Sequence, residues 1–186
     1  MHELAADLGV EVRGATGNVN KGWAGHVFEH YLGLAPNSDQ SPDFGSWELK
    51  VIPLVQMATG KLRVKETMAI TMIDAVDVAR TPFEQSHLLS KLQKAIVVAR
   101  IVGSDVDDPS VVHSVNELNL EGELFDQVRR DYEEVRRCLK DPSQGFGALS
   151  GSMGTYVQPR TKGAGHGSIS RAFYARPLFI EKVVKL

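Results

Sequence analysis

Two opposite charges stand at the start of a strand that this sequence predicts to enter a core. The segment WELKVIPL begins at Trp47 and is typical of a β-strand that enters a core, with Glu48 and Lys50 two residues apart. Side chains alternate between the two faces of a strand, so these two charges share one face while Leu49 lies on the other. The charges therefore occupy one face of a strand that otherwise belongs to the core.

A third charge comes just before this strand. Asp43 follows Pro42 in the preceding turn, from where its side chain can swing toward the face of Glu48 and Lys50. Two carboxylates that meet at one point repel each other unless a cation lies between them. Mg²⁺ prefers oxygen ligands and takes one or two carboxylates, so the pattern favours a site for Mg²⁺, or Mn²⁺ in its place. Lys50 could then position a water molecule beside the ion. A plain surface strand with a Glu–Lys pair is the alternative.

The composition is typical of one soluble globular domain, expected over residues 1–186. The chain is 42% hydrophobic and 24% charged. Its single cysteine, Cys138, excludes an intramolecular disulfide and a Cys-based zinc cluster, which favours the reducing cytoplasm. No run of about 18 apolar residues occurs, so no membrane partner is expected.

Positive charge gathers near the C-terminus, although the formal net charge of the chain is −2. Residues 156–186 carry six lysines and arginines against one glutamate. Such a concentration of charge within the C-terminal part, residues 150–186, indicates contact with an anionic partner. A basic surface tail is the plainer alternative.

Hydrophobic periodicity predicts strands flanked by helices in one α/β or α+β domain. Pro53 is expected to end the first strand, and Gly60 to mark the turn before the second. Helices are expected over residues 22–33, 82–93 and 120–140 and around Ile180, and strands over 47–54, 60–73, 94–103 and 156–158.

The chain also resembles a known family of nucleases. The matching segments are NKGWAGHVFEHYLG, DF…ELKVIP, KET, SHLLSKL, YVQPRTK and RAFYARPLF, in the family's order and over most of the chain from Asn20 onward. Pro42-Asp43 and Glu48-Leu49-Lys50 resemble the PD-(D/E)xK signature, and the ordered set resembles the MutH family, which joins a mismatch-repair nicking endonuclease to certain type II restriction enzymes. The resemblance implies a restriction-endonuclease-like fold with a central mixed β-sheet, flanking helices and a DNA-binding cleft.

The resemblance also implies roles for individual residues. Mg²⁺ would be held by Asp43, Glu48 and the carbonyl of Leu49. The spacer between the two carboxylates is shorter here than in the mismatch-repair enzyme. The implied catalytic residues are Asp43, Glu48, Lys50, Lys91 and Glu29, and the implied DNA contacts are Lys21, Arg160, Thr161, Lys162, Arg171 and Tyr174. Among the latter, Tyr174 would sense adenine methylation.

The implied activity is that of a Mg²⁺-dependent deoxyribonuclease that cuts double-stranded DNA at GATC or a related short site and leaves 5′-phosphate ends. We expect it to act as a monomer or a transient dimer on DNA. The alternative is a mismatch-repair endonuclease that nicks hemimethylated GATC. A cognate methyltransferase or a mismatch-repair activator would be the protein partner.

A second motif points to different chemistry. His26, Glu29 and His30 spell H-x-x-E-H, the pattern of an inverzincin zinc site. The two histidines are four residues apart and share a helix face, which suits two zinc ligands. No clear third ligand follows on an adjacent helix, so a zinc metallopeptidase is the remote alternative. The intact Glu48–Lys50 pair disfavours a catalytically inactive DNA-binding module.

Overall fold

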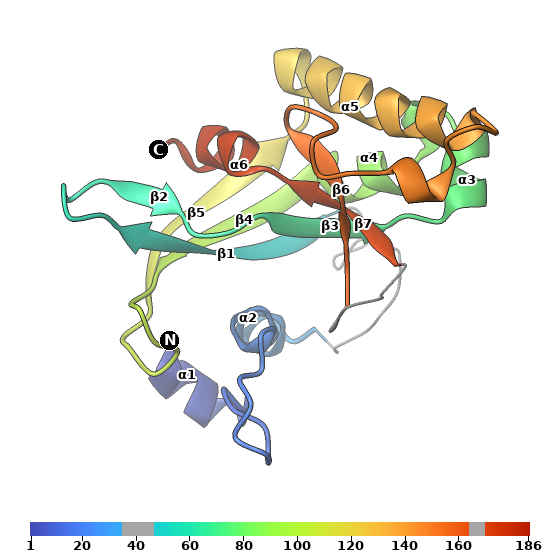
Figure 1. Cartoon of the computed structure of the whole chain (residues 1–186). Coiled ribbons are helices and arrows are strands. Elements are labelled where there is room, and N and C mark those ends of the chain that lie inside the picture. Colours follow the sequence, from blue (N-terminus) through green and yellow to red (C-terminus); the bar gives the residue numbers. More distant parts are fainter. Residues whose placement is uncertain (35–46, 164–169) are drawn as a thin grey trace.

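A four-stranded mixed sheet lies at the centre of the molecule (Figure 1). The computed structural model describes residues 1–34, 47–163 and 170–186. The strands of the central sheet, in spatial order, are β2 (Leu62–Val64), β1 (Glu48–Gln56), β4 (Lys94–Ile101) and β5 (Val111–Asn119). β1 and β4 run parallel, whereas the β1–β2 and β4–β5 pairs are antiparallel.

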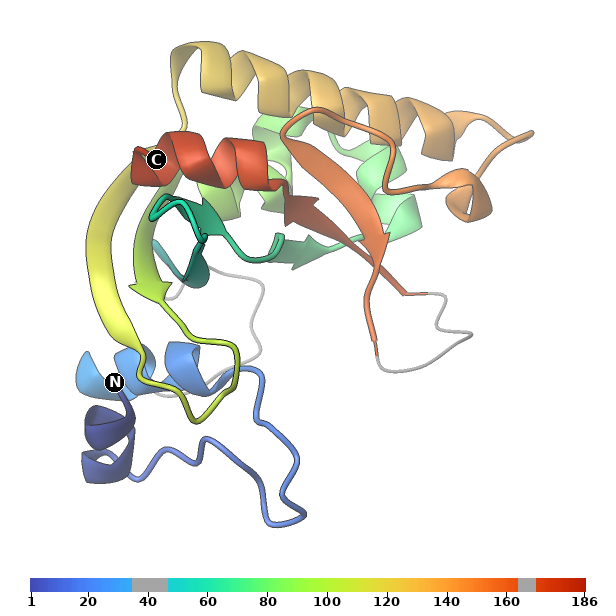
Figure 2. The same ribbon diagram turned by 60° about the vertical axis from the view of Figure 1, so that its left-hand side comes forward.

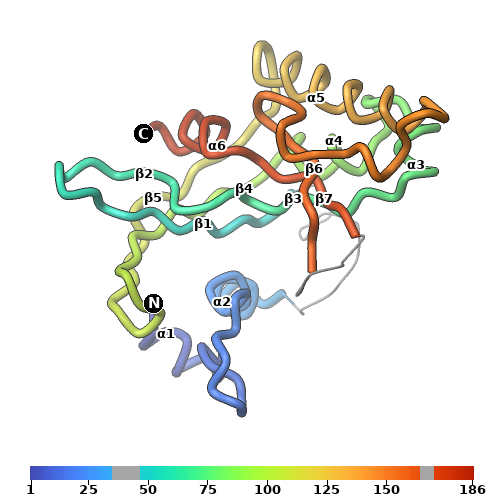
Figure 3. The backbone as a smooth tube through the Cα atoms, viewed as in Figure 1, coloured from blue at the N-terminus to red at the C-terminus, as the bar shows by residue number. Residues whose placement is uncertain are grey.

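Helices cover both faces of this sheet, as Figures 1 and 3 show. α1 (His2–Asp7) and α2 (Trp23–Tyr31) lie on one side. The other side carries α4 (His87–Leu92), α5 (Gly122–Lys140) and α6 (Pro177–Val184), and α3 (Ala75–Arg80) packs against α5. Short 3-10 turns occur at η1 (Phe83–Gln85) and η2 (Phe146–Ala148). The predicted fold class, a mixed sheet flanked by helices, is confirmed.

A second, antiparallel sheet contains the C-terminal strands. Its order is β3 (Met68–Met72), β7 (Arg171–Ala175) and β6 (Val157–Thr161). The single strand predicted over residues 60–73 is therefore wrong, because β2 and β3 belong to different sheets. The chain passes from one sheet to the other at the three successive polar residues Lys65, Glu66 and Thr67.

Pro53 does not end β1, contrary to the prediction. Its carbonyl accepts a hydrogen bond from Lys65 N–H at 3.0 Å. In a strand, the N–H and the carbonyl of one residue point to the same side, so the N–H that proline lacks would have pointed away from β4. The paired residues of β1 and β2 begin only at Leu54. Because the missing N–H would lie on the β2 side, the hydrogen bonds between β1 and β4 are complete despite the proline.

Strands β5 and β7 were not expected from the sequence. β5 is an edge strand whose residues are mostly exposed, and β7, although mostly buried, directly follows a stretch rich in glycine and serine. The helix predicted over residues 82–93 divides at Ser86, whose Oγ accepts the N–H of Leu89 at 3.1 Å and caps α4. The other predicted helices are present, within about two residues for α5.

Two apolar clusters form the core, and β1 contributes to both. Ile52 and Leu54 belong to the main cluster, which β4, α4, α5 and α6 complete, while Val51 packs against a smaller cluster around Trp23. This division confirms the alternation predicted for β1. In the main cluster the hydroxyl of Tyr132 donates to Thr81 O at 3.0 Å, and burial raises the pKa of this tyrosine to about 12. No helix in the described ranges is long and apolar enough to cross a membrane.

A buried carboxylate on α5 anchors the start of β6. Asp131 is 2% exposed and accepts three backbone N–H groups, from Thr155 at 2.9 Å, Tyr156 at 2.6 Å and Val157 at 2.8 Å. Charge-assisted hydrogen bonds of this kind are stronger than neutral ones. Asp131 therefore links the start of β6 directly to α5.

The loop before β6 is held from a second side by Arg176. Its guanidinium donates to the carbonyls of Gly151, Met153 and Gly154 at 2.6–3.1 Å. Gly154 has φ +72°, and a Cβ at this position would lie 1.9 Å from the carbonyl oxygen of Val157. The close turn into β6 therefore requires glycine.

We predict that Asp131→Ala lowers the free energy of unfolding by about 3 kcal/mol, because it leaves buried backbone N–H groups without an acceptor. Urea denaturation measures this difference. Asp126→Ala is the matched control, since Asp126 is exposed on the same helix, and it should change stability by less than about 0.5 kcal/mol. Equal stability of the two variants would show that Asp131 does not anchor β6.

Candidate active site

Three charged side chains meet at the beginning of β1. Glu48 Oε1 lies 2.5 Å from Lys50 Nζ, and Glu48 Oε2 lies 2.7 Å from Lys91 Nζ. Glu48 is 2% exposed and Lys91 6% exposed, so this ionic cluster is largely removed from solvent. The structure therefore brings together three of the residues that the sequence singled out as catalytic.

The secondary structure accounts for this convergence. Glu48 and Lys50 share a face of β1, as predicted, and this face lies toward the main apolar cluster. Lys91 is in the last turn of α4, which packs against β4. In the parallel ladder Glu48 pairs with Ala95, whose small side chain leaves space beside the carboxylate. The cluster thus joins β1 to a helix 43 residues away in sequence.

The charges of the cluster suit a further anionic group. One carboxylate faces two ammonium groups, so the three side chains together carry a net positive charge. Asp43, the other predicted metal-binding carboxylate, lies outside the described residues. Within the described ranges no group of three or more His, Cys, Asp or Glu side chains gathers.

The donor chemistry of the cluster fits Mg²⁺. Each carboxylate oxygen of Glu48 has two lone pairs, so it can accept a hydrogen bond from lysine and still bind a metal ion. Carboxylate and carbonyl oxygens are the ligands that Mg²⁺ prefers. Glu48 and the carbonyl of Leu49 are thus suitable ligands, and the magnesium site stays a prediction.

A hollow of about 260 Å³ lies between α2 and β1. Glu29 lines it from α2, Lys21 from the turn before that helix, and Leu49 and Lys50 from β1. The structure therefore places the predicted helix glutamate and the predicted DNA-contacting lysine beside the start of β1. Glu66 and Arg100 also line this hollow, although neither was predicted to be a catalytic or DNA-contacting residue.

The zinc-site alternative gains no support from α2. His26 lines the hollow, whereas His30 is exposed. With Glu29 the two histidines do not form a metal-binding group, as judged from residues 1–34, 47–163 and 170–186.

The predicted DNA-contacting residues of the C-terminal segment lie on or directly beside the β6–β7 ribbon. Thr161 and Arg171 are opposite each other, and Arg171 Nη1 donates to Thr161 Oγ1 at 2.8 Å. Lys162 follows β6 and is exposed. In Figure 2 this ribbon and the loop before α2 project to the same side of the molecule.

Arg160 and Tyr174 form a pair on this ribbon. The guanidinium of Arg160 lies 5.7 Å from the centre of the Tyr174 ring, and Arg160 Nη1 donates to Thr67 Oγ1 at 2.7 Å. Thr67 directly follows Glu66 of the hollow, so one turn of chain between β2 and β3 touches both regions. The KET motif, residues 65–67, was one of the segments that carried the family resemblance, but no contact of Thr67 was predicted.

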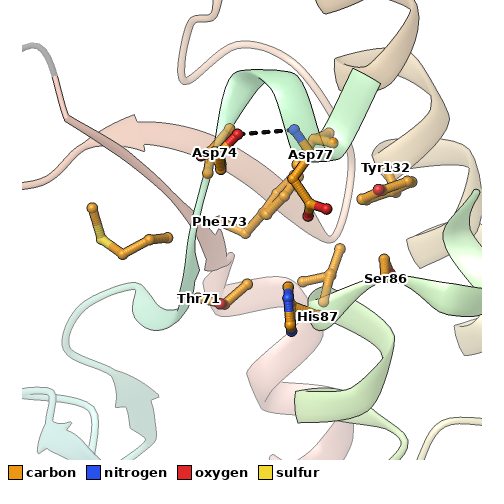
Figure 4. A pocket seen from close by; sticks show the side chains of 11 residues that line it. Thr71, Asp74, Asp77, Ser86, His87, Tyr132 and Phe173 are labelled. Carbon is orange, nitrogen blue, oxygen red and sulfur yellow. Dashed lines mark hydrogen bonds between the residues drawn. The ribbon is translucent and has the colours of Figure 1, made fainter. Parts of the chain in front are cut away.

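A separate hollow of about 350 Å³ lies between β3, α3, α4 and α5 (Figure 4). Its labelled residues include Asp77 and His87, whose side chains lie on opposite sides of the space. Asp74 accepts the N–H of Asp77 at 2.8 Å and so caps α3. None of the residues singled out in the sequence lines this hollow, and we assign it no role in the active site.

We predict that Lys91→Met lowers the free energy of unfolding by about 2–4 kcal/mol, because a buried carboxylate loses one of its counter-charges. The double variant with Glu48→Gln should recover part of this loss, since a neutral amide needs no counter-charge. Urea denaturation of the two single variants and the double variant gives the coupling free energy, which we expect to be about 1–3 kcal/mol. Purely additive effects would show that the two side chains do not stabilise each other.

Comparison with known proteins agrees with this arrangement. The family described as "DNA mismatch repair enzyme MutH" matches residues 32–121, the range that contains the whole ionic cluster. A curated relative, the DNA mismatch repair protein MutH of Shewanella woodyi, is 30% identical over 161 residues, or 82% of this chain. The chain spans 65% of the length of that relative. These matches and the mixed sheet flanked by helices agree with each other, and this chain is similar to the MutH family.

Proposed function

We propose that this chain is a Mg²⁺-dependent endonuclease that cuts double-stranded DNA at a specific short sequence. The observation that carries the proposal is the ionic cluster of Glu48, Lys50 and Lys91 at the start of β1. Two lysines on one buried carboxylate provide positive charge where a phosphodiester would be attacked. Similarity to the MutH family supports the same activity.

The residues of the cluster have different tasks in this proposal. Asp43, Glu48 and the carbonyl of Leu49 would hold Mg²⁺, which supplies Lewis acidity and a more acidic water when bound. Lys50 orients the attacking water and takes part in its deprotonation. Lys91 pairs with Glu48 and holds it in place, because a carboxylate with 2% exposure needs a counter-charge. Both ammonium groups offset the negative charge that develops on the phosphate.

Recognition of the target belongs to the β6–β7 ribbon in this proposal. Arg160 has the planar fork that reads guanine in the major groove, and Tyr174 lies against it. Lys21, which lines the hollow between α2 and β1, is suited to a contact with the same duplex. We propose GATC or a related site as the target, and Tyr174 as the residue that senses adenine methylation.

The biological role follows from whether one strand or both are cut. The curated relative is named a mismatch repair protein, and a nicking enzyme in repair would work with a mismatch-repair activator. A restriction enzyme would cut both strands, as a transient dimer, and would have a cognate methyltransferase. We propose the restriction-type activity first, with repair nicking as its alternative.

Digestion of methylated, hemimethylated and unmethylated plasmid in Mg²⁺, followed by mapping of the ends, tests the function. We expect cuts at one short sequence with 5′-phosphate ends. Linear products would indicate restriction and open circles would indicate nicking. Intact plasmid in all three forms, with and without Mn²⁺, would contradict the proposal.

We predict that Glu48→Ala abolishes cleavage and keeps DNA affinity within about tenfold of the wild type, because the side chain serves the reaction centre and not the duplex. Lys50→Ala should also be inactive, and higher Mg²⁺ should not restore it. Cleavage of labelled cognate duplex and fluorescence anisotropy measure the two properties. Glu123→Ala, at an exposed position of α5, should behave as wild type. Normal turnover by Glu48→Ala would refute the active-site assignment.

We predict that Arg160→Ala weakens binding of the cognate duplex by about 1–3 kcal/mol and leaves a scrambled duplex nearly unaffected, as expected for a base contact. Tyr174→Phe keeps the ring beneath the guanidinium and removes only the hydroxyl. It should preserve cutting of unmodified sites and change the response to adenine methylation. Binding curves on cognate, methylated and scrambled duplexes at two salt concentrations separate these effects. Equal loss on all three duplexes would mean that Arg160 contacts only the backbone.

A further inference from the structure

A second hollow adjoins the one beside β1. It measures about 290 Å³ and shares four lining residues with the first: Lys21, Pro53, Glu66 and Arg100. The two hollows therefore lie on either side of the same residues and together follow β1 away from the ionic cluster. Pro53 pairs with Arg100 in the parallel ladder, five residues beyond the pairing of Glu48 with Ala95.

Positively charged side chains follow one another along these two hollows. Lys21 and Arg100 line both hollows and Lys65 lines the second, whereas the side chain of Lys50 lies against Glu48 on the other face of β1. Lys65 is exposed in the polar turn between β2 and β3. Acids line the same hollows, namely Glu29, Glu66, Asp105 and Asp108, but neither Arg100 nor Lys65 forms an ion pair within 4.0 Å in the described ranges.

Arg100 is held in place with donors to spare. Its Nη1 donates to Ser110 Oγ at 2.8 Å, and its guanidinium lies 5.0 Å from the ring centre of Trp23, which is 3% exposed. Its Nε is buried and has no hydrogen-bond partner in the described part of the chain. Stacking on an indole fixes the guanidinium plane, so a ligand would meet terminal nitrogens that are already oriented.

The nearby acids do not neutralise Arg100. Asp108 accepts Asp105 N–H at 2.8 Å, and the Asp105 carboxylate lies 3.5 Å from Arg13. Glu66 raises the pKa of Arg100, but burial acts more strongly in the opposite direction and lowers it overall. No ion pair within 4.0 Å joins Arg100 to an acid in the described ranges. The partly buried guanidinium thus lacks a close counter-charge.

We propose that Arg100 and Lys65 form a subsite for a backbone phosphate of the DNA strand that passes the ionic cluster. This inference rests on the proposed function, since it names contacts of the same substrate. An arginine whose plane is fixed can bind two phosphate oxygens, and the exposed lysine adds a mobile charge. The subsite positions DNA and carries no sequence information.

The test measures DNA binding against salt concentration in the Glu48→Ala background, where the duplex is not cut. Arg100→Gln and Lys65→Gln should each reduce the slope of log K against log salt by about 0.9, the value for one lost phosphate contact. Both should weaken cognate and scrambled duplexes equally. Arg137→Gln is the matched control, because it removes the same charge from an exposed position on α5, and its slope should equal that of the parent.

An unchanged slope in either variant that remains folded overturns the subsite. Arg100 would then be a structural partner of Trp23 and Ser110. If Arg100→Gln unfolds in a thermal melt, the exposed Lys65→Gln variant decides the question. Two further measurements, DNA binding by the Glu48→Ala parent variant and DNA cleavage by the wild type, distinguish this result from failure of the proposed function. A parent that does not bind DNA, with a wild type that does not cut it, contradicts the function itself, whereas normal binding with unaltered slopes contradicts only the subsite.

Discussion

A buried carboxylate between two lysines is the interaction on which the rest of this structure depends. A charge with 2% exposure costs several kcal/mol unless opposite charges meet it. Lys50 comes with the same strand, but Lys91 requires that the chain pass through β2, β3 and α3 before α4 returns to the sheet. The parallel pairing of β1 with β4 and the position of α4 are therefore both conditions for the contact between Glu48 and Lys91.

The cluster and the β6–β7 ribbon are connected by a very short segment. Thr67 accepts a hydrogen bond from Arg160, and Glu66, one residue earlier, lines the hollow beside β1. These two residues lie where the chain leaves the central sheet for the second one. The side chains proposed for chemistry and those proposed for recognition thus belong to different sheets that share one covalent junction.

Sequence patterns over a few residues predicted the features that depend only on residues close together in the chain. Alternation along β1 was enough to place Glu48 and Lys50 on one face, and periodicity was enough to locate α5. Lys91 lies 43 residues from Glu48, so only the family resemblance could suggest their meeting. β5 escaped prediction because most of its residues are exposed and give no continuous apolar pattern, and β7 is a five-residue central strand that directly follows a stretch rich in glycine and serine. Arg100 did leave a signal, a charge within the apolar run KAIVVARIVG, but its stacking on Trp23 depends on the packing of α2 against the sheet.

The two ends of β6 differ in a way that bears on how such a protein can diverge. Val157, Gln158 and Pro159 are buried, whereas Arg160 and Thr161 are exposed. Asp131 and Arg176 hold only the buried end and the loop before it. Substitutions at the exposed end can therefore alter what the strand touches at little cost in folding free energy, while the buried end has to be conserved with α5. With the function proposed above, single replacements at the exposed end of this strand would change DNA preference without a new fold.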